Sequence, residues 1–417
     1  MRSVAEHQRV VAAMIRARPA TTVALAEAQG LVLADDVVAR LALPVFDNSA
    51  MDGYAIRAED ASHATPEHPV VLPVAEDIPA GRTDELLLKP GTAHRIMTGA
   101  PVPAGANAIV PVEDTDGGVH TVAIRKTGPS GKHIRRAGED VAPGTTVLRK
   151  GQVVSPAMLG LASALGIAEL PVIPRQRVLV ISTGSELVPP GTPLRPGQIY
   201  ESNSIMLAGA VRDAGAAVIA VATAEDDVAQ FGSILDQYAG PQRQVDLIIT
   251  SGGVSAGAYE VVKDAFGRDG DQGVEFVKVA MQPGMPQGIG RLRTKGGGAT
   301  IVTLPGNPVS ALVSFEVFIR SPLRKAMGLP DPDRPHRPAV LTEALTAPRG
   351  KRQFRRAILE APTEPGGLER QVGRVTGYGP AASHHLRWLA SANGLLDIPE
   401  DVEEVSAGTL LQVWDLT

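Results

Sequence analysis

The segments that decide the fold are RVLVIST (residues 177–183), VDLIIT (245–250) and ATIVT (299–303). Each is short, mostly apolar and rich in β-branched residues, and segments of helical periodicity separate them. Strands that are buried on both faces of a sheet read as continuous apolar runs. This rhythm therefore predicts a doubly wound, mainly parallel α/β sheet domain over residues 174–328, with helices on both faces.

The rest of the chain predicts further parts of an α/β multidomain protein. Short strands are cut by Pro and Gly in the first half, and alternating strands follow a Pro-rich linker in the last quarter. The expected parts are an N-terminal helix packed on the α/β domain (1–20), a small α+β linking domain (21–43 plus 138–173), a β-rich domain (44–137) and a C-terminal β-barrel (329–417). Ser155, directly before Pro156, is the predicted N-cap of a helix.

The composition excludes several classes of protein. The chain has 417 residues, with 40 Lys and Arg against 45 Asp and Glu, a formal charge of −5 and no Cys. This charge argues against extended binding to nucleic acid or to anionic membranes. The absence of Cys excludes disulfides, thiolate zinc sites and Cys nucleophiles. Charges interrupt the apolar positions of the N-terminal helix, and no apolar run reaches the about 20 residues of a membrane span, so we expect a cytoplasmic protein.

Small and polar residues follow the predicted strands, at the sheet edge where ligands bind in such folds. Residues 251–257 (SGGVSAG) form a glycine-rich turn before a predicted helix, where free N–H groups and the helix dipole attract an anion. Residues 305–308 (PGNP) also open a helix. For either segment alone, an ordinary capping turn is the alternative. The predicted ligand-binding residues are Ser251, Gly252, Gly253, Ser255, Gly257, Pro305, Gly306, Asn307 and Pro308.

Acidic residues lie at the same edge, namely Glu186, Asp226, Asp227 and Glu260. A lone carboxylate near a helix start is usually a cap, and either of the two neighbouring aspartates could be one. Several carboxylates beside a phosphate-binding turn favour a hard cation such as Mg²⁺. We therefore predict Glu186, Asp227 and Glu260 as metal ligands, and the choice between Asp226 and Asp227 stays open.

Three polar stretches outside the predicted sheet also stand out. They are DNSAMDGYA (residues 47–55), HIRRAGED (133–140) and the basic residues between Arg349 and Arg356. Their ordinary interpretations are an Asx-turn linker, a solvated hairpin and a solvated strand face, respectively. The functional alternative for the basic stretch is contact with an oxyanion.

In order along the chain, eight segments resemble the molybdopterin molybdenumtransferase family, known as MoeA in bacteria and as the carboxy-terminal region of gephyrin. The resemblance covers essentially the whole chain. The segments are PVFDNSAMDGYA, RIMTGAPVPAGANAIVPVED, IRRAGEDV, VISTGSEL, SGGVSAG, MQPGMPQG, LPGNPVSA and SHHLRWLASANGLLDIP.

The resemblance implies a molybdopterin-binding α/β domain and a homodimer with composite active sites. In this family the cleft lies between the α/β domain of one subunit and the β-rich domain of the other. The implied reaction inserts molybdate into adenylylated molybdopterin, with Mg²⁺ present and AMP released, during molybdenum cofactor biosynthesis. Other proteins of that pathway are implied as further partners, and neither nucleic acid nor a membrane is.

Matching the motifs residue by residue gives the implied catalytic residues Asp52, Thr98, Asp140, Lys278, Arg356 and Ser383. Glu186 and Asp227 would hold Mg²⁺ against the phosphates, and Asp52 of the other subunit would bind the metal or orient water. Lys278, Arg356 and Ser383 would offer donors to molybdate. The amides of the SGGVSAG turn would bind phosphate.

The chain departs from the family pattern at Glu260, where many members have Asp, and at Gln282 and Met285, where lysines are frequent. Gln282 and Met285 make the oxyanion pocket less positive than in those members. This difference could lower turnover or change the preference between molybdate and tungstate. Two alternatives to the transferase follow. One is a paralogue with weakened catalysis that acts as a scaffold for cofactor intermediates, and the other is an enzyme like the molybdopterin adenylyltransferases.

Overall fold

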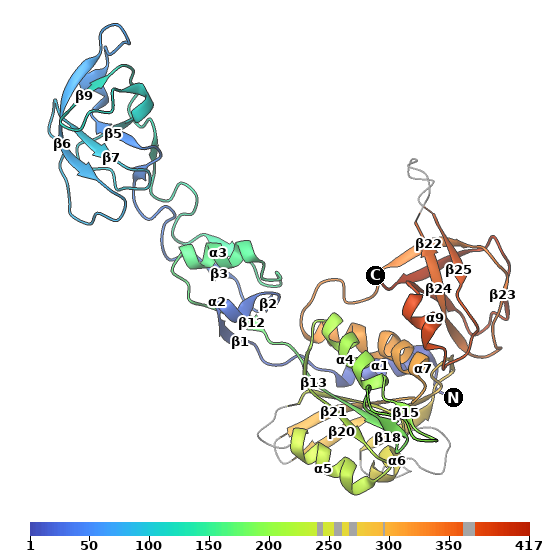
Figure 1. Cartoon of the computed structure of the whole chain (residues 1–417). Helices are drawn as coiled ribbons and strands as arrows, with labels where there is room; N and C mark the ends of the chain where they lie inside the picture. Colours follow the sequence, from blue (N-terminus) through green and yellow to red (C-terminus); the bar gives the residue numbers. More distant parts are fainter. Residues whose placement is uncertain (240–244, 254–260, 267–272, 295–296, 362–371) are drawn as a thin grey trace. The chain divides into compact units, whose positions relative to one another are not determined.

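The computed structural model describes residues 1–239, 245–253, 261–266, 273–294, 297–361 and 372–417 (Figure 1). Contacts divide the chain into two units: one combines Met1–Thr21 with Ile173–Thr417, and the other is Thr22–Val172. No helix in the described ranges is long and apolar enough to cross a membrane. The expected cytoplasmic location stays a prediction.

The first unit is built on a six-stranded sheet in the order β16-β13-β17-β21-β20-β18. Its first four strands are parallel: β16 (Ala217–Ala224), β13 (Arg177–Thr183), β17 (Leu247–Ser251) and β21 (Gly297–Leu304). Alternate side chains of β13 enter two different cores, so both faces of the sheet are covered. The predicted doubly wound α/β fold is confirmed.

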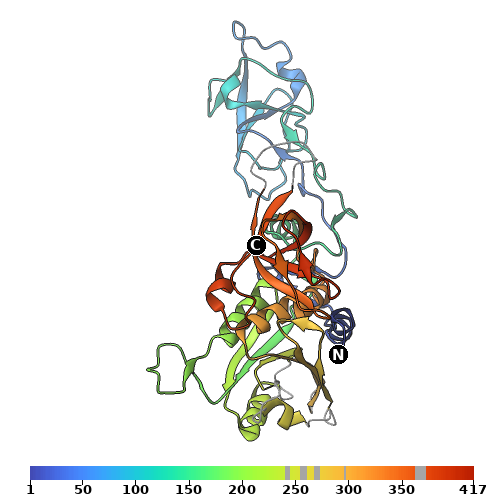
Figure 2. The same cartoon turned by 90° about the vertical axis from the view of Figure 1, so that its right-hand side faces the viewer.

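Helices supply the other half of each core. On one face lie α1 (Val4–Met14), α4 (Asn203–Asp213) and α7 (Pro308–Ser314). On the other lie α5 (Val228–Ala239) and α6 (Val261–Phe266). An arm that carries the short strands β14 (Leu187–Val188) and β15 (Ile199–Tyr200) projects from this domain (Figure 2).

The sheet contains one strand that the sequence analysis does not predict. β20 (Pro286–Thr294) pairs antiparallel with β21 and with β18 (Val274–Lys278). Its glycines resemble turn residues in the sequence, but they mark close contacts between strands. A Cβ atom at Gly290 would lie 2.1 Å from the carbonyl oxygen of Gly273, so only glycine fits there.

The predicted long helix after the PGNP turn has an irregular centre. It runs from α7 through a π-helix, η3 (Phe315–Arg320), into α8 (Ser321–Ala326). Pro322 accounts for the irregularity because it has no N–H to donate to the preceding turn. The carbonyl of Val317 instead accepts a hydrogen bond of 3.1 Å from Nε2 of Gln8. This bond ties α1 to the long helix.

The predicted C-terminal β-barrel is confirmed. Its strands are β22 (His336–Leu341), β24 (Arg352–Glu360), β25 (Gly373–Gly377), β26 (Gly394–Ile398) and β28 (Leu410–Asp415). The sheet closes because β24 pairs with both β25 and β26. The smaller elements are β23 (Leu345–Thr346), β27 (Glu404–Val405) and α9 (Leu386–Ser391). β19 (Met281–Gln282) pairs with β24 and so joins the α/β domain to the barrel.

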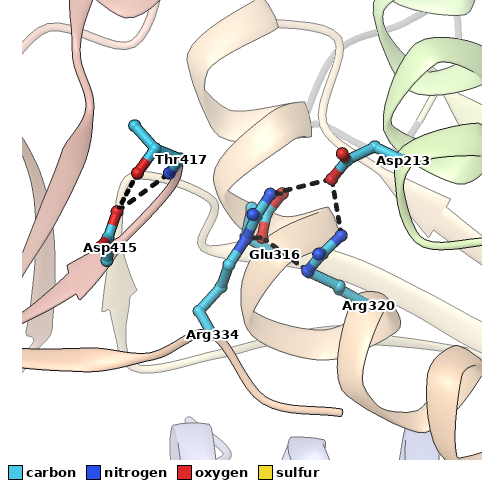
Figure 3. A network of polar contacts seen from close by, with 6 residues as sticks. All are labelled: Asp213, Glu316, Arg320, Arg334, Asp415 and Thr417. Atoms are coloured by element: carbon cyan, nitrogen blue, oxygen red, sulfur yellow. Dashed lines mark hydrogen bonds and ion pairs between the residues drawn. The ribbon is translucent and has the colours of Figure 1, made fainter. Parts of the chain in front are cut away.

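A network of three buried charges and the exposed Asp213 fastens the linker between these two domains (Figure 3). Arg334 of the linker donates to Glu316 of η3 at 2.9 Å and to Asp213 of α4 at 3.1 Å. Arg320 of η3 also contacts Asp213, at 2.8 Å. The two guanidinium groups thus share the buried Glu316 and the exposed Asp213, which offsets the cost of burying Arg320, Arg334 and Glu316.

The second unit contains the remaining sheets. One has the order β8-β5-β7-β6-β9, formed by β5 (Gly53–Ile56), β6 (Val70–Ile78), β7 (Ala93–Ile96), β8 (Ala108–Pro111) and β9 (Thr121–Ile124). Smaller sheets use β1 (Thr21–Ala24), β2 (Val32–Leu33), β3 (Val37–Val38), β4 (Asn48–Ser49), β10 (Ile134–Arg135), β11 (Thr146–Leu148) and β12 (Glu169–Ile173). The helices are α2 (Leu25–Ala28) and α3 (Pro156–Ala164), with η1 (Ala58–Ala61) and η2 (Val112–Asp114). Ser155 caps α3 as predicted.

His7 of α1 is a histidine without polar contacts. It is completely buried, its ring lies edge-on to Phe318 with centroids 4.7 Å apart, and neither nitrogen has a partner in the described part of the chain. Burial lowers the pKa of His7 from 6.5 to about 4, and Arg2 adds to the effect. The unfolded chain therefore takes up a proton at a higher pH than the folded chain does.

We predict that this histidine makes the first unit sensitive to mild acid. Its contribution to stability is complete above pH 6.5 and is lost as the pH falls towards about 4, by about 3 kcal/mol in total. His7→Met should remove this part of the pH dependence. Urea unfolding of the wild type and of His7→Met at several pH values gives the free energy of unfolding of each. The buried His94, whose pKa is also lowered, is present in both proteins, so the difference between the two curves reports His7 alone. If the free energy of unfolding changes with pH equally in the two proteins, the prediction is contradicted.

Candidate active site

A cleft of about 660 Å³ opens at the carboxyl ends of the parallel strands in the first unit. Turns after β13, β17 and β21 form its floor, and the β14–β15 arm and the start of α9 form its walls. The lining residues include Gly184, Glu186, Tyr200, Asn203, Asp226, Ser251, Gly252, Gly253, Gly306, Asn307, Pro308 and His384. The edge of the sheet chosen from sequence is therefore the edge that carries a cavity.

The turn after β17 packs so closely on its neighbours that glycine is required. Gly252 has φ +101°, and a Cβ atom there would lie 2.5 Å from the carbonyl oxygen of Thr183. Gly253 has φ +66°, and a Cβ atom there would lie 3.0 Å from Cγ2 of Val262. Ser251 and both glycines line the cleft. The other predicted residues of this segment, Ser255, Gly257 and Glu260, lie outside the described residues.

The PGNP turn lies beside the glycine turn and reaches the barrel domain. The N–H of Gly252 donates to the carbonyl of Leu304 at 3.1 Å. Nδ2 of Asn307 donates to Oγ of Ser383 at 3.0 Å, and the N–H of Val309 donates to the Ser383 carbonyl at 3.1 Å. Pro305 is buried, whereas Gly306 is exposed. The structure therefore brings Ser383 next to the predicted ligand-binding turn.

Two carboxylates lie at the cleft, and a third caps a helix. The carboxylate of Glu186 folds beside Gly184, where a Cβ atom would lie 2.6 Å from Oε2 of Glu186. Asp226 is held by Ser185, whose N–H donates to it at 3.2 Å and whose Oγ accepts from the Asp226 N–H at 2.9 Å. Asp227 accepts the N–H of Gln230 at 2.7 Å and so caps α5. Only Glu186 and Asp226 of these three line the cavity.

The implied cationic residues do not line the cleft. Arg356 is 3% exposed, and its guanidinium donates to the carbonyls of Pro380 and His385, on either side of Ser383. Burial lowers the pKa of Arg356, and neighbouring Arg355 adds to the effect. Lys278, at the end of β18, is exposed. Arg356 thus anchors the loop that carries Ser383.

Gln282, one of the positions that depart from the family pattern, lies beside this loop. Gln282 accepts a hydrogen bond of 3.1 Å from Nε2 of Gln353 in β24, so its amide carbonyl is engaged in the joint between the domains. Gln282, Arg356 and the residues before Ser383 line one small pocket. The Met285 carbonyl accepts the N–H of Val279.

The remaining predicted residues lie in the second unit. Asp52 accepts two hydrogen bonds at one oxygen, from the N–H of Thr98 at 2.6 Å and from its Oγ1 at 2.7 Å. These bonds lower the pKa of Asp52 and keep it ionised. Asp140 is exposed and donates only its N–H, to the Leu43 carbonyl at 3.0 Å. The structure therefore pairs Asp52 with Thr98, while Asp140 makes no side-chain bond to either among the described residues.

Residues at the start of α4 also line the cleft, and they were not predicted as site residues from the sequence. Glu201 is buried and accepts hydrogen bonds from Oγ of Ser182 at 2.7 Å and from the N–H of Ser204 at 2.7 Å. Asn203 contacts both ligand-binding turns. The available signal was the polar run ESNS at 201–204, directly before a predicted helix.

The positions of Asp226 and Asp227 predict that replacing Asp227 lowers stability more than replacing Asp226. Asp227→Ala removes a helix cap and should lower the free energy of unfolding by about 1 kcal/mol. Asp226→Ala removes one exposed contact and should change it by less than about 0.5 kcal/mol. Denaturant titration of the two variants measures the difference, and a larger loss for Asp226→Ala would show that the cap is assigned to the wrong aspartate.

The comparisons with known proteins agree with this architecture. Residues 2–166 match the "MoeA N-terminal region (domain I and II)", residues 179–325 a "probable molybdopterin binding domain", and residues 338–416 the "MoeA C-terminal region (domain IV)". The chain is 76% identical to molybdopterin molybdenumtransferase 2 of Mycobacterium tuberculosis over 421 aligned positions, covering all of both chains. It is 37% identical to molybdopterin molybdenumtransferase 1 of the same species, covering 99% of this chain and 98% of that one.

A solved structure extends the comparison to three dimensions. The crystal structure of a molybdopterin biosynthesis MoeA protein from Pyrococcus horikoshii aligns with a TM-score of 0.74 at 28% identity, covering 100% of this chain and 99% of that one. The predicted resemblance is confirmed over the whole length, and the chain belongs to the MoeA family.

Proposed function

We propose that the protein is a molybdopterin molybdenumtransferase, which inserts molybdate into adenylylated molybdopterin and releases AMP. The observation that carries the proposal is the cleft itself: two turns, Ser251–Gly253 and Gly306–Pro308, lie side by side at the carboxyl ends of the strands, with two carboxylates beside them. The relative that is 76% identical to this chain is named molybdopterin molybdenumtransferase 2. Such turns bind phosphate through backbone N–H groups that face the ligand.

Cleaving the bond between AMP and the molybdopterin phosphate requires charge neutralisation and alignment more than covalent catalysis. A Cβ atom at Gly252 would collide with the Thr183 carbonyl, so glycine lets this turn pack against the end of β13 and lie beside the PGNP turn, where both turns can reach one phosphate group. Ser383, fixed by Asn307 and by the carbonyl contacts of Arg356, presents its hydroxyl beside the same turns. Lys278 is exposed at the end of β18, and we assign it to the incoming oxyanion on the family resemblance.

The carboxylates fit a magnesium site that the nucleotide completes. Mg²⁺ is commonly held by one or two carboxylates together with substrate phosphates and water. Glu186 and Asp226 meet this requirement, and no cluster of three or more His, Cys, Asp or Glu ligands exists among the described residues. When bound, Mg²⁺ neutralises phosphate charge. Since Asp227 is engaged as a helix cap, we assign the second carboxylate to Asp226.

The proposal includes a homodimer in which Asp52 and Thr98 of one subunit complete the cleft of the other. Apolar side chains support it, because Val45 and Phe46, directly before the DNSAMDGYA stretch, are 55% and 49% exposed. Exposed apolar residues beside a polar functional segment are typical of an interface. Asp52 itself is exposed and ionised, ready to orient a metal-bound or attacking group.

The activity test also examines the metal assignment. The purified protein, given adenylylated molybdopterin, Mg²⁺ and molybdate, should release AMP. Asp226→Asn should raise the half-saturating Mg²⁺ concentration at least about tenfold, because an amide binds Mg²⁺ more weakly than a carboxylate. Asp227→Asn is the matched control, since asparagine caps helices as well as aspartate does.

Two results would contradict these assignments. Absence of AMP release by the wild type would reject the transferase and favour the scaffold alternative. A raised Mg²⁺ requirement in Asp227→Asn but not in Asp226→Asn would transfer the ligand role to Asp227.

Subunit complementation tests the composite site. Asp52→Asn and Glu186→Gln should each be inactive alone, but a heterodimer of the two retains one site with both carboxylates. Random mixing should therefore restore about a quarter of the wild-type activity, because half of the dimers are mixed and each has one intact site. A mixture as inactive as its parents would place both carboxylates in the site of a single subunit.

A further inference from the structure

Asn203, the first residue of α4, links the two ligand-binding turns. Its Nδ2 donates to Oγ of Ser251 at 2.8 Å and to the carbonyl oxygen of Gly306 at 2.6 Å. A carbonyl oxygen can only accept, so the second bond fixes which side of the amide carries the nitrogen. One NH₂ group therefore uses both of its hydrogens to hold the turn after β17 next to the turn after β21.

The backbone that presents Asn203 is itself held firmly. Glu201 is 5% exposed, and its carboxylate accepts from the N–H and Oγ of Ser204 and from Oγ of Ser182, at the end of β13. These bonds attach the start of α4 to the central strand of the sheet. Asn203 thus projects from a rigid element rather than from a loop, which is how side chains that set the geometry of a site are best held.

The other half of the Asn203 amide makes no bond to any residue that the structure describes. Its Oδ1 is buried and has no hydrogen-bond partner among the described residues. A buried acceptor without a partner lowers stability, so this side chain is not well optimised for holding the fold together. The benefit of asparagine at this position must come from the two bonds that Nδ2 makes across the cleft floor.

The same floor continues into the barrel domain. Gly306, which accepts from Asn203, is followed by Asn307, which donates to Ser383. The carbonyls on either side of Ser383 accept from Arg356. A continuous chain of hydrogen-bonded segments therefore runs from Ser251 through Asn203 and the PGNP turn to the loop of Ser383.

We infer that Asn203 is a positioning residue of the transferase: it sets the spacing of the two turns that bind the adenylylated substrate, and it acts through Ser251 and Gly306. This inference rests on the proposed function. Because Asn203 defines the shape of the binding floor before the reaction begins, its loss should weaken substrate binding in the ground and transition states alike, which raises KM more than it lowers kcat.

The test compares steady-state AMP release by the wild type and Asn203 variants, with adenylylated molybdopterin as the varied substrate. Asn203→Ala should raise KM about tenfold, with kcat within about threefold of the wild type. Its melting temperature should stay within about 2 °C, because the lost bonds and the removed unpaired acceptor offset each other. Asn203→Asp should raise KM further, because a carboxylate oxygen would face the Gly306 carbonyl.

A matched control comes from Asn393 in the barrel. Its side-chain amide also ties backbone together, accepting from the N–H of Leu359 at 2.7 Å and donating to the carbonyl of Leu359 at 2.9 Å, but it does not line the cleft. Asn393→Ala should lower the melting temperature and leave KM unchanged. The two asparagines therefore separate a role in substrate binding from a role in stability.

The outcomes are distinguishable. If the wild type releases no AMP, the proposed function fails and the inference fails with it. If the wild type is active and Asn203→Ala keeps its KM, or loses stability as Asn393→Ala does, the proposed function stands and the role of Asn203 is rejected. A double variant with Ser251→Ala should raise KM by less than the product of the single effects, since both side chains act through one hydrogen bond.

Discussion

The close approach of the glycine turn to the end of β13 is the constraint on which the cleft depends. With a Cβ atom at Gly252, the turn would collide with the carbonyl of Thr183, and the N–H of Gly252 could no longer donate to Leu304. The turn after β17 would then move away from both of its neighbours. The phosphate binding that we propose for this cleft depends on this close spacing, because it would bring backbone amides of neighbouring turns to one ligand.

The joint between the α/β domain and the barrel extends this local geometry. β19 pairs with β24, the Gln282 and Gln353 side chains meet beside it, and Arg334 fastens the linker to Glu316 and Asp213. These contacts make the barrel loop that carries Ser383 part of the same cleft as the sheet turns. Arg356 donates hydrogen bonds to backbone carbonyls of this loop, so its charge holds the loop in place and does not lie at the cavity surface.

Wherever strand order alone decided the outcome, the sequence predicted which residues meet at the cleft. Parallel strands that end at one edge bring Glu186, Ser251 and Gly306 together whatever the details of packing. The pattern was less informative where a residue serves two purposes. Glycines in β20 resembled a turn because their role is close contact between strands, and the sequence left open which of Asp226 and Asp227 caps α5, a role that the structure gives to Asp227. Whether Arg356 faces a cavity or a carbonyl depends on tertiary packing, which no periodicity in the sequence encodes.

The measurement that tests the account most directly is amide hydrogen exchange of the whole protein with and without AMP and Mg²⁺. Binding at the strand ends should slow amide exchange in residues 183, 184, 186, 251–253, 306 and 307, which line the cleft. The first unit also contains a cavity of about 500 Å³ between α1, η3 and the barrel, lined by Arg9, Arg320 and Trp414. Protection confined to that region, or absent from the cleft floor, would contradict the assignment of the active site.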